Sequence, residues 1–267
     1  GFFDVLPERR APPGHTLEAL SQTNVDYQGW HEAGAYAVVK GQLHRRAGDI
    51  HLTLRIFITE EGRFLRLPQD TQRLTSADPQ TVKAATARWV DELVGHFTGI
   101  SGVASLRIAF AKRITRLGPK EIGVSDIDGD FERKVTRDGS INVLPAWTTK
   151  GHIAYTSFRR SNADLFIGER LFSSRPSMNT GAAFYRDGTR VALTLSRDGN
   201  PEIYILDAKT GAEQRRITQH PAIDISPTWS PDGETLAFVT DRYTGRPQLA
   251  KVASSGGEPE RLPQVGG

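Results

Sequence analysis

The stretch from Trp229 to Phe238 reads WSPDGETLAF, and the stretch from Phe184 to Leu193 reads FYRDGTRVAL. Both place an aromatic residue three positions before an Asp-Gly pair and an apolar run after it. A more degenerate copy, WTTKGHIAY, begins at Trp147, and a partial copy, RIAF, begins at Arg107. The alanines at equivalent positions, 109, 154, 192 and 237, are 45, 38 and 45 residues apart. Short strands and turns repeating at this period are typical of the blades of a β-propeller.

The copy around residue 190 shows how one blade is expected to form. We expect its innermost strand to begin at Ala183-Phe184, and its second and third strands to span 191–195 and 203–207. Asp-Gly pairs at 187–188 and 198–199 would supply the tight turns, because glycine readily adopts positive φ. A single blade cannot bury both of its faces, so the copies are expected to pack against one another.

The part before the repeats has a different pattern. Residues 50–59 alternate, with apolar residues at every second position, which predicts a strand with one wetter face. Asp78-Pro79 is a helix-start signal, and apolar residues then recur every three or four positions as far as Phe97. We therefore predict an α/β domain over 1–104, followed by an all-β, incomplete β-propeller of about three and a half WSPDG-type blades over 105–267.

Composition excludes several classes of protein. The net charge is +3 and no run of Lys or Arg exceeds two residues, so nothing predicts nucleic-acid binding. The longest apolar run, Ala35 to Val39, is far too short to span a bilayer. The chain has no cysteine, which excludes disulfides, thiolate metal sites and cysteine nucleophiles.

The residues that could carry chemistry are better explained as structure. Asp126, Asp128 and Asp130 imitate a calcium loop, but glycine comes fourth rather than sixth and no Glu follows at the required position. The other Asp-Gly pairs recur at turn positions. The seven histidines show no metal-binding spacing, and there is no Gly-x-Ser-x-Gly elbow. We therefore expect no catalytic residue, no metal site and no cofactor.

In their order along the chain, several motifs resemble the TolB family of the Gram-negative Tol–Pal system. The stretch FTGIS from Phe97, followed by RIAF from Arg107, resembles the family's junction between its first domain and its propeller. The same is true of PAW at Pro145, SPTWSPDG at Ser226 and GRPQ at Gly245. The resemblance implies an α/β domain and a six-bladed propeller. It also implies that this chain is a fragment that continues with further blades and a terminal strand like Pro145-Ala146-Trp147.

The resemblance also carries expectations of function. It implies a non-enzymatic periplasmic protein whose propeller binds the peptidoglycan-associated lipoprotein Pal, supporting outer-membrane integrity and cell division. It implies contact with TolA through a segment absent from this chain, and no direct insertion into the membrane.

The expected partner-binding residues are the loops that precede each inner strand, because loops on a rigid scaffold commonly carry recognition. The family's histidine in the middle loop appears as Met178 here. The candidates are Asn142, Val143 and Leu144; Met178, Asn179, Thr180 and Gly181; and Asp224, Ile225 and Ser226.

Two alternatives stay open at this point. WSPDG propellers also gate serine peptidases of the prolyl-oligopeptidase type, in which case a hydrolase domain would lie beyond Gly267. The junction that resembles TolB argues against this interpretation. The other alternative is a TolB-like propeller protein with an unknown partner.

Overall fold

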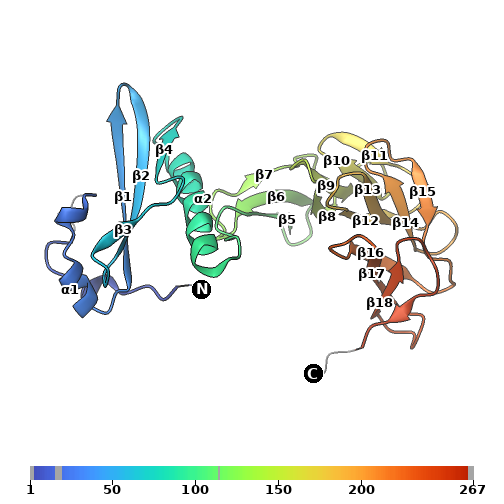
Figure 1. Ribbon diagram of the computed structural model, residues 1–267. Helices are drawn as coiled ribbons and strands as arrows, with labels where there is room; N and C mark the ends of the chain where they lie inside the picture. The colour runs from blue at the N-terminus through green and yellow to red at the C-terminus, as the bar shows by residue number, and fades with distance from the viewer. Residues whose placement is uncertain (1–2, 16–19, 114, 264–267) are drawn as a thin grey trace. The chain divides into compact units, whose positions relative to one another are not determined.

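The computed structural model describes residues 3–15, 20–113 and 115–263, and the chain divides into two compact units, residues 1–106 and 107–267 (Figure 1). Within the described residues, no helix combines the length and the hydropathy needed to cross a bilayer.

The first unit holds a four-stranded antiparallel sheet and a long helix. The central strand β2 pairs with β1 along one edge and with both β3 and β4 along the other. The elements are α1 (Tyr27–Glu32), β1 (Ala37–Arg46), β2 (Asp49–Ile58), β3 (Arg63–Leu65), β4 (Thr71–Leu74) and α2 (Pro79–Thr98), with short 3-10 turns at Glu8–Arg10 and Gln22–Asn24.

The core of this unit follows from the alternation in β2. Leu52, Leu54, Ile56 and Ile58 are buried on one face of the strand, together with Ala85, Trp89 and Leu93 from α2. The indole Nε1 of Trp89 donates to Oδ1 of Asp70 at 3.2 Å, so its polar atom is satisfied. The predicted strand and the predicted helix stripe therefore meet in one cluster.

The ends of α2 are where the sequence predicts them. Asp78 is the N-cap and accepts a hydrogen bond from the Thr81 amide at 3.0 Å, with Pro79 as the first helical residue. At the other end Gly99 has φ of +71°, and its N–H bonds the carbonyl of Gly95. That left-handed turn stops the helix.

The described residues of the second unit form one three-stranded sheet and three four-stranded antiparallel sheets in chain order. These sheets follow one another along the unit in Figure 1. We number them blades 1 to 4. Blade 1 has β5 (Arg107–Arg113), β6 (Lys120–Asp126) and β7 (Arg133–Lys134); blade 2 has β8 (Asn142–Trp147), β9 (Ile153–Ser157), β10 (Asp164–Ile167) and β11 (Arg170–Ser173). Blade 3 has β12 (Asn179–Phe184), β13 (Arg190–Leu195), β14 (Glu202–Asp207) and β15 (Glu213–Arg216); blade 4 has β16 (Asp224–Trp229), β17 (Thr235–Thr240), β18 (Gln248–Ala253) and β19 (Glu260–Arg261).

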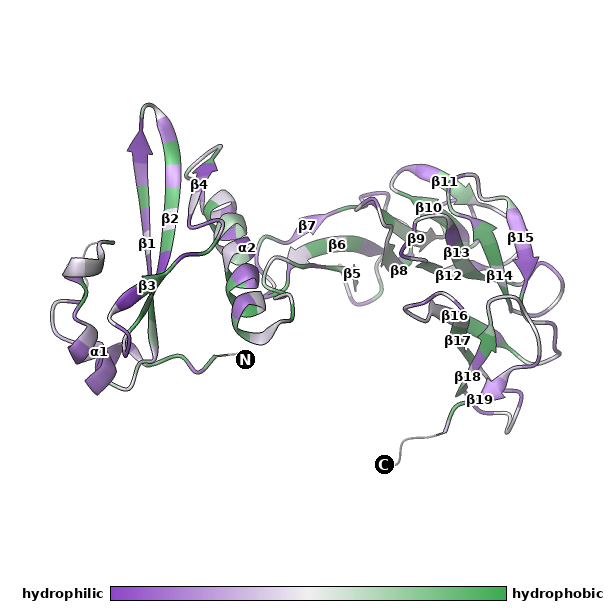
Figure 2. Ribbon diagram, viewed as in Figure 1, coloured by the Kyte–Doolittle hydropathy of each residue, from purple (hydrophilic) through white to green (hydrophobic). Residues whose placement is uncertain are grey.

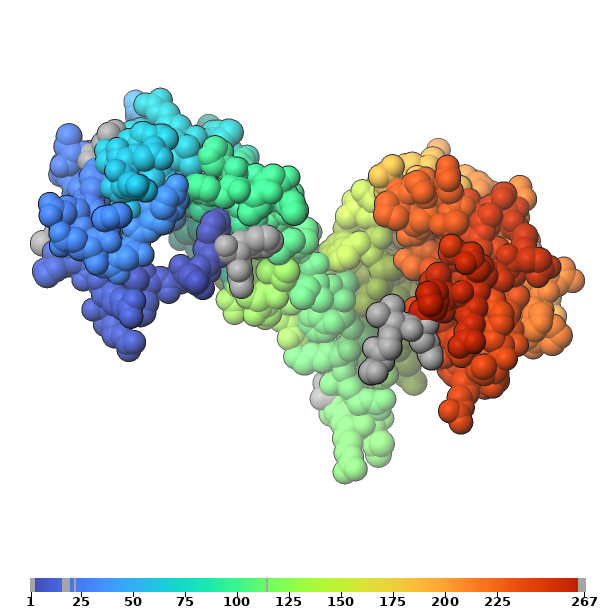
Figure 3. All heavy atoms as spheres, turned by 60° about the horizontal axis from the view of Figure 1, so that its bottom comes forward, coloured from blue at the N-terminus to red at the C-terminus, as the bar shows by residue number. Residues whose placement is uncertain are grey.

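Burial changes across blade 3. Strands β13 and β14 are almost wholly buried and hydrophobic, whereas the outermost strand β15 is exposed and hydrophilic (Figure 2). Blade 1 has no strand on the free side of β5 among the described residues, and the segment 115–119 that leads into β6 projects from the unit (Figure 3).

The inner strand of blade 3 corrects one prediction. It begins at Asn179, so Ala183 and Phe184 end the strand rather than begin it. The pairing between β12 and β13 shifts between Thr180 and Ala183, which is a β-bulge. Because a bulge breaks the two-residue alternation, the first half of the strand has no recognisable strand pattern in the sequence.

Neighbouring blades meet through the repeated positions. Ala192 of blade 3 lies in one buried cluster with Leu236 and Phe238 of blade 4. Tyr185 packs over Gly233, where a Cβ would lie 2.4 Å from the tyrosine ring, and its hydroxyl donates to the carbonyl of Asp232 at 2.7 Å. Tyr185, which stands where the copy at 229–238 has Ser230, thus packs blade 3 against blade 4.

Candidate functional site

The three predicted loops are in fact largely strand. Asn142, Asn179 and Asp224 are the first residues of β8, β12 and β16, and all three are 0% exposed. Of the ten predicted contact residues, only Met178 lies before its strand rather than in it. The expectation that these segments are loops is therefore wrong, because the bulged halves of the inner strands were not recognised as strand.

Asn142 and Asn179 each tie two blades together. The Asn142 Nδ2 donates to Oδ1 of Asp138 at 2.8 Å and to Oε2 of Glu121 in blade 1 at 3.3 Å. The Asn179 Oδ1 accepts from the Ser173 hydroxyl of blade 2 at 2.6 Å, and its Nδ2 donates to the carbonyl of Ala163 at 3.0 Å. Buried amides with these partners fix the start of the inner strand.

Asp224 carries a charge at the equivalent position in blade 4. Its Oδ2 accepts a hydrogen bond from Nη2 of Arg242, whose side chain is only 10% exposed. Burial raises the pKa of Asp224 above its usual value, against the opposing effects of the Thr240 hydrogen bond and Arg242. Asp224 and Arg242 therefore form a buried, charge-assisted pair.

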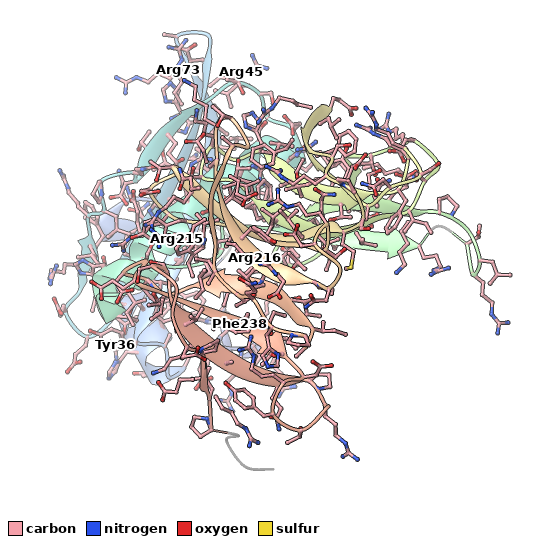
Figure 4. All side chains as sticks on the ribbon, turned by 90° about the vertical axis from the view of Figure 1, so that its right-hand side faces the viewer. Tyr36, Arg45, Arg73, Arg215, Arg216 and Phe238 are labelled. Carbon is pink, nitrogen blue, oxygen red and sulfur yellow. The ribbon has the colours of Figure 1, made fainter. Side chains whose placement is uncertain are left out.

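Buried glutamates hold the same end of blades 1 and 3. Thr218 Oγ1 donates to Oε2 of Glu202 at 2.5 Å, and the His220 amide donates to its Oε1 at 2.7 Å. Arg216, which extends from β15 (Figure 4), donates to the same Oε1 at 3.2 Å. In blade 1 Glu121 accepts from Thr136 and from the Gly139 amide in the same way.

These glutamates were missed by sequence reasoning, although a signal exists. Strands β10, β14 and β18 are the third strands of blades 2 to 4, and β6 is their equivalent in blade 1, which lacks a first strand among the described residues. Each of these four strands has a polar residue at or next to its start: Glu121, Asp164, Glu202 and Gln248. They are 43, 38 and 46 residues apart, close to the blade period. A polar residue repeating with the blades, directly before a buried apolar strand, could have revealed them.

Each bulge places one residue in the left-handed region. Leu144, Gly181 and Ser226 have φ of +53°, +64° and +55°, each two residues after the buried Asn or Asp. The pairing with the second strand shifts across each of them. Leu144 and Ser226 are non-glycine residues held in this strained conformation, and both are exposed.

The residues directly before the buried Asn or Asp are apolar and exposed. Ile141, Met178 and Ile223 are 49%, 37% and 45% exposed. Phe158 is exposed beside Ile141, because its amide donates to the carbonyl of Ile141 at 3.0 Å. Leu144, three residues after Ile141 in the chain, is exposed as well. One end of blades 2 to 4 therefore carries apolar side chains on a rigid polar base, and we call these five residues the apolar rim.

Of the predicted contact residues, the structure exposes Leu144, Met178 and Ser226 and half-buries Val143, Gly181 and Ile225. It buries Asn142, Asn179, Thr180 and Asp224, which act as supports. Sequence reasoning missed Ile141, Phe158 and Ile223.

The suspected calcium loop is the turn between β6 and β7. The Gly129 amide donates to the carbonyl of Asp126, and the Asp130 amide donates to Oδ1 of Asp128 at 3.3 Å. Nowhere in the described parts of the chain do three metal-ligating side chains gather.

Comparison with known proteins agrees with this blade architecture. The family model described as the TolB beta propeller domain matches residues 94–267. The chain belongs to the TolB family.

Curated TolB relatives align with most of the chain. "Tol-Pal system protein TolB" of Anaeromyxobacter dehalogenans is 31% identical over 237 residues, which cover 86% of this chain and 52% of the relative. "Protein TolB homolog" of Chlorobium luteolum is 28% identical over 256 residues, covering 93% and 56%. The chain thus spans about half the length of the curated TolB proteins it matches.

Solved TolB structures have a similar fold. The crystal structure of TolB from Acinetobacter baumannii matches with a TM-score of 0.77 and 26% identity, covering 91% of this chain and 62% of that one. A putative TolB from Agrobacterium tumefaciens matches in fold, with a TM-score of 0.51 and 16% identity.

Proposed function

We propose that this chain is part of a non-enzymatic, periplasmic component of the Tol–Pal system, whose propeller binds the lipoprotein Pal through the apolar rim. Membership in the TolB family supports the assignment of the chain to the Tol–Pal system. The observation that carries the binding role is the repetition of one arrangement, a buried Asn or Asp with an exposed apolar residue directly before it, in three successive blades.

The chemistry of the rim suits a protein partner. Apolar side chains that stay exposed on a folded protein mark interaction surfaces when they form a patch, and here Ile, Leu, Met and Phe are exposed at the same end of three successive blades. The buried hydrogen bonds below hold the backbone in place, so little ordering cost is expected on binding. Through this contact the protein would support outer-membrane integrity and cell division.

A binding experiment with matched variants tests the proposal. Purified Pal is titrated against the chain and against Met178→Asp and Ile223→Asp by calorimetry. Each substitution places a charge within the rim, and each is expected to weaken Pal binding by about tenfold or more.

The control is Ile127→Asp, at an exposed apolar residue of blade 1. Ile127 follows the end of β6, whereas Ile141 bridges to Lys120 at the start of β6, so the two lie at opposite ends of that strand. Equal losses for the control and the rim variants, or unchanged binding in the rim variants, would contradict the proposed surface.

Membership in the TolB family favours this role over that of a peptidase gate.

A further inference from the structure

A second surface lies at the other end of the blades, in a pocket of about 370 Å³ between blades 2 and 3. It is formed by the turns that join β8 to β9, β10 to β11, β12 to β13 and β14 to β15. The apolar rim precedes β8 and β12, whereas this pocket follows them. The two surfaces are therefore separated by the length of a strand.

The pocket has an apolar floor and a basic edge. Ile167, Phe184 and Ala208 contribute apolar surface, and Phe184 also packs against the buried cluster of blades 2 and 3. Four basic side chains line the same pocket, and no carboxylate does. They are Lys150, His152, Arg170 and Lys209.

The positive charge in the pocket is offset at one lysine by Asp207, which attracts Lys209 electrostatically. In the described parts of the chain, neither Lys150 nor Lys209 has a carboxylate within ion-pair distance. Glu169, next to Arg170 in sequence, faces Arg159 at 3.3 Å. Asp207 is engaged within its own turn, where its Oδ1 accepts from the amides of Lys209 and Thr210 at 3.0 and 2.7 Å.

Hydrogen bonds and close packing hold the turns that present these basic side chains. Thr148 bonds the backbone of His152 twice, through its amide at 2.8 Å and through its hydroxyl at 3.0 Å. The Gly188 backbone lies against Thr149, so that an added Cβ would be 2.6 Å from its Oγ1. The Arg170 Nη1 donates to the carbonyl of Lys209 at 3.4 Å, which joins blade 2 to blade 3.

We propose that this pocket is a second binding site, which takes an acidic peptide segment with an apolar side chain between its carboxylates. Its volume is at the lower end of the range for ligand pockets. The basic groups come from three separate turns along the groove between the blades, an arrangement that suits carboxylates spaced along a chain better than one compact anion. The apolar floor receives the side chain between them.

The test is an NMR titration of the chain with the peptide acetyl-Asp-Leu-Glu-Phe-Asp-amide. Amide shifts are expected at Gly188, Ala208 and Lys209, in the lining of the pocket. The double variant Lys150→Gln/Lys209→Gln is expected to weaken binding by about tenfold or more, and added salt to weaken it further.

The matched control is Lys134→Gln/Lys251→Gln, which removes the same charge from strands β7 and β18, outside the pocket. Binding that is lost equally in both double variants would reflect net charge alone and would overturn the proposal. So would the absence of shifts at the pocket up to about 5 mM peptide.

Inorganic phosphate is titrated in parallel. If it shifts the same amides with the same affinity as the peptide, the pocket is a simple anion site and the peptide proposal is wrong. Because the apolar rim is unchanged in all these variants, Pal binding reports separately on the proposed function.

Discussion

Asp224 differs from its equivalents Asn142 and Asn179 by one charge, and its environment differs accordingly. The two asparagines use an uncharged amide instead: Nδ2 of Asn142 donates to the carboxylates of Asp138 and Glu121, and Asn179 bonds the Ser173 hydroxyl and the Ala163 carbonyl. Asp224 has a guanidinium partner, Arg242, on the turn that follows β17 of its own blade. Removing the partner of a buried ion costs far more than the pair contributes, because the remaining charge stays buried.

Arg242→Met is therefore expected to lower the free energy of unfolding of the second unit by about 3 kcal/mol at neutral pH. Chemical denaturation at several pH values measures this. Because burial already raises the pKa of Asp224, the folded protein keeps that proton more readily than the unfolded chain, whose pKa is near 3.8. This group's contribution to stability thus falls as pH rises from about 4 to its folded pKa.

Asp224→Asn is the control for this prediction, since asparagine stands at the same position in two other blades. Its loss of stability is expected to be smaller than that of Arg242→Met, and the pH dependence due to Asp224 should vanish. An Arg242→Met protein as stable as the original would show that the pair is not a structural support.

Helix α2 offers two glycines, one with a helical and one with a left-handed backbone, at which a substitution by alanine can be compared. Gly95 lies inside the helix, where an added Cβ would meet only the Ile100 carbonyl at 3.8 Å. Gly99 lies at its end with φ of +71° and open space around it. Steric conflict is thus absent at both, and backbone conformation alone decides the effect of alanine.

We expect Gly99→Ala to destabilise the first unit by about 1 kcal/mol and Gly95→Ala to stabilise it by about 0.5–1 kcal/mol. Thermal unfolding followed by circular dichroism measures both. Changes of the same sign in the two variants would contradict the assignment of Gly99 as the residue that ends the helix.

At the scale of the molecule, each buried cluster lies within one unit. The cluster around Trp89 uses only residues of the first unit, and the clusters around Leu193, Leu236 and Tyr155 use only residues of the second. Stability should accordingly be lost one unit at a time.

Trp89→Ala, at a residue that is 1% exposed, should cost the first unit about 3–5 kcal/mol. Amide hydrogen exchange read by mass spectrometry should show faster exchange over β2 and α2, with β13 and β14 unchanged. Leu193→Ala is the reciprocal control, expected to act on β13 and β14 alone. Faster exchange throughout the chain in either variant would mean that the units unfold together.

Local patterns in the sequence determined the repeat, its turns and the helix with both of its ends. The Asp-Gly pairs, Asp78-Pro79 and Gly99 act through neighbouring residues, so their conformations can be predicted from the sequence nearby. The alternation in β2 likewise predicted that Leu52, Leu54, Ile56 and Ile58 enter the core. The prediction that the other face is wetter is wrong at Thr53 and Phe57, which are also buried.

The candidate site depended on the tertiary structure. The bulges at Leu144, Gly181 and Ser226 interrupt the alternation that marks a strand, so Asn142, Asn179 and Asp224 resemble loop residues in the sequence. Their partners lie in the preceding blade, for Asn142 and Asn179, or beyond the following strand, for Asp224. The exposed residues Ile141 and Ile223 directly precede these strands. Contacts between residues far apart in sequence leave no local pattern, and only packing of the blades decides which side chains support the surface and which form it.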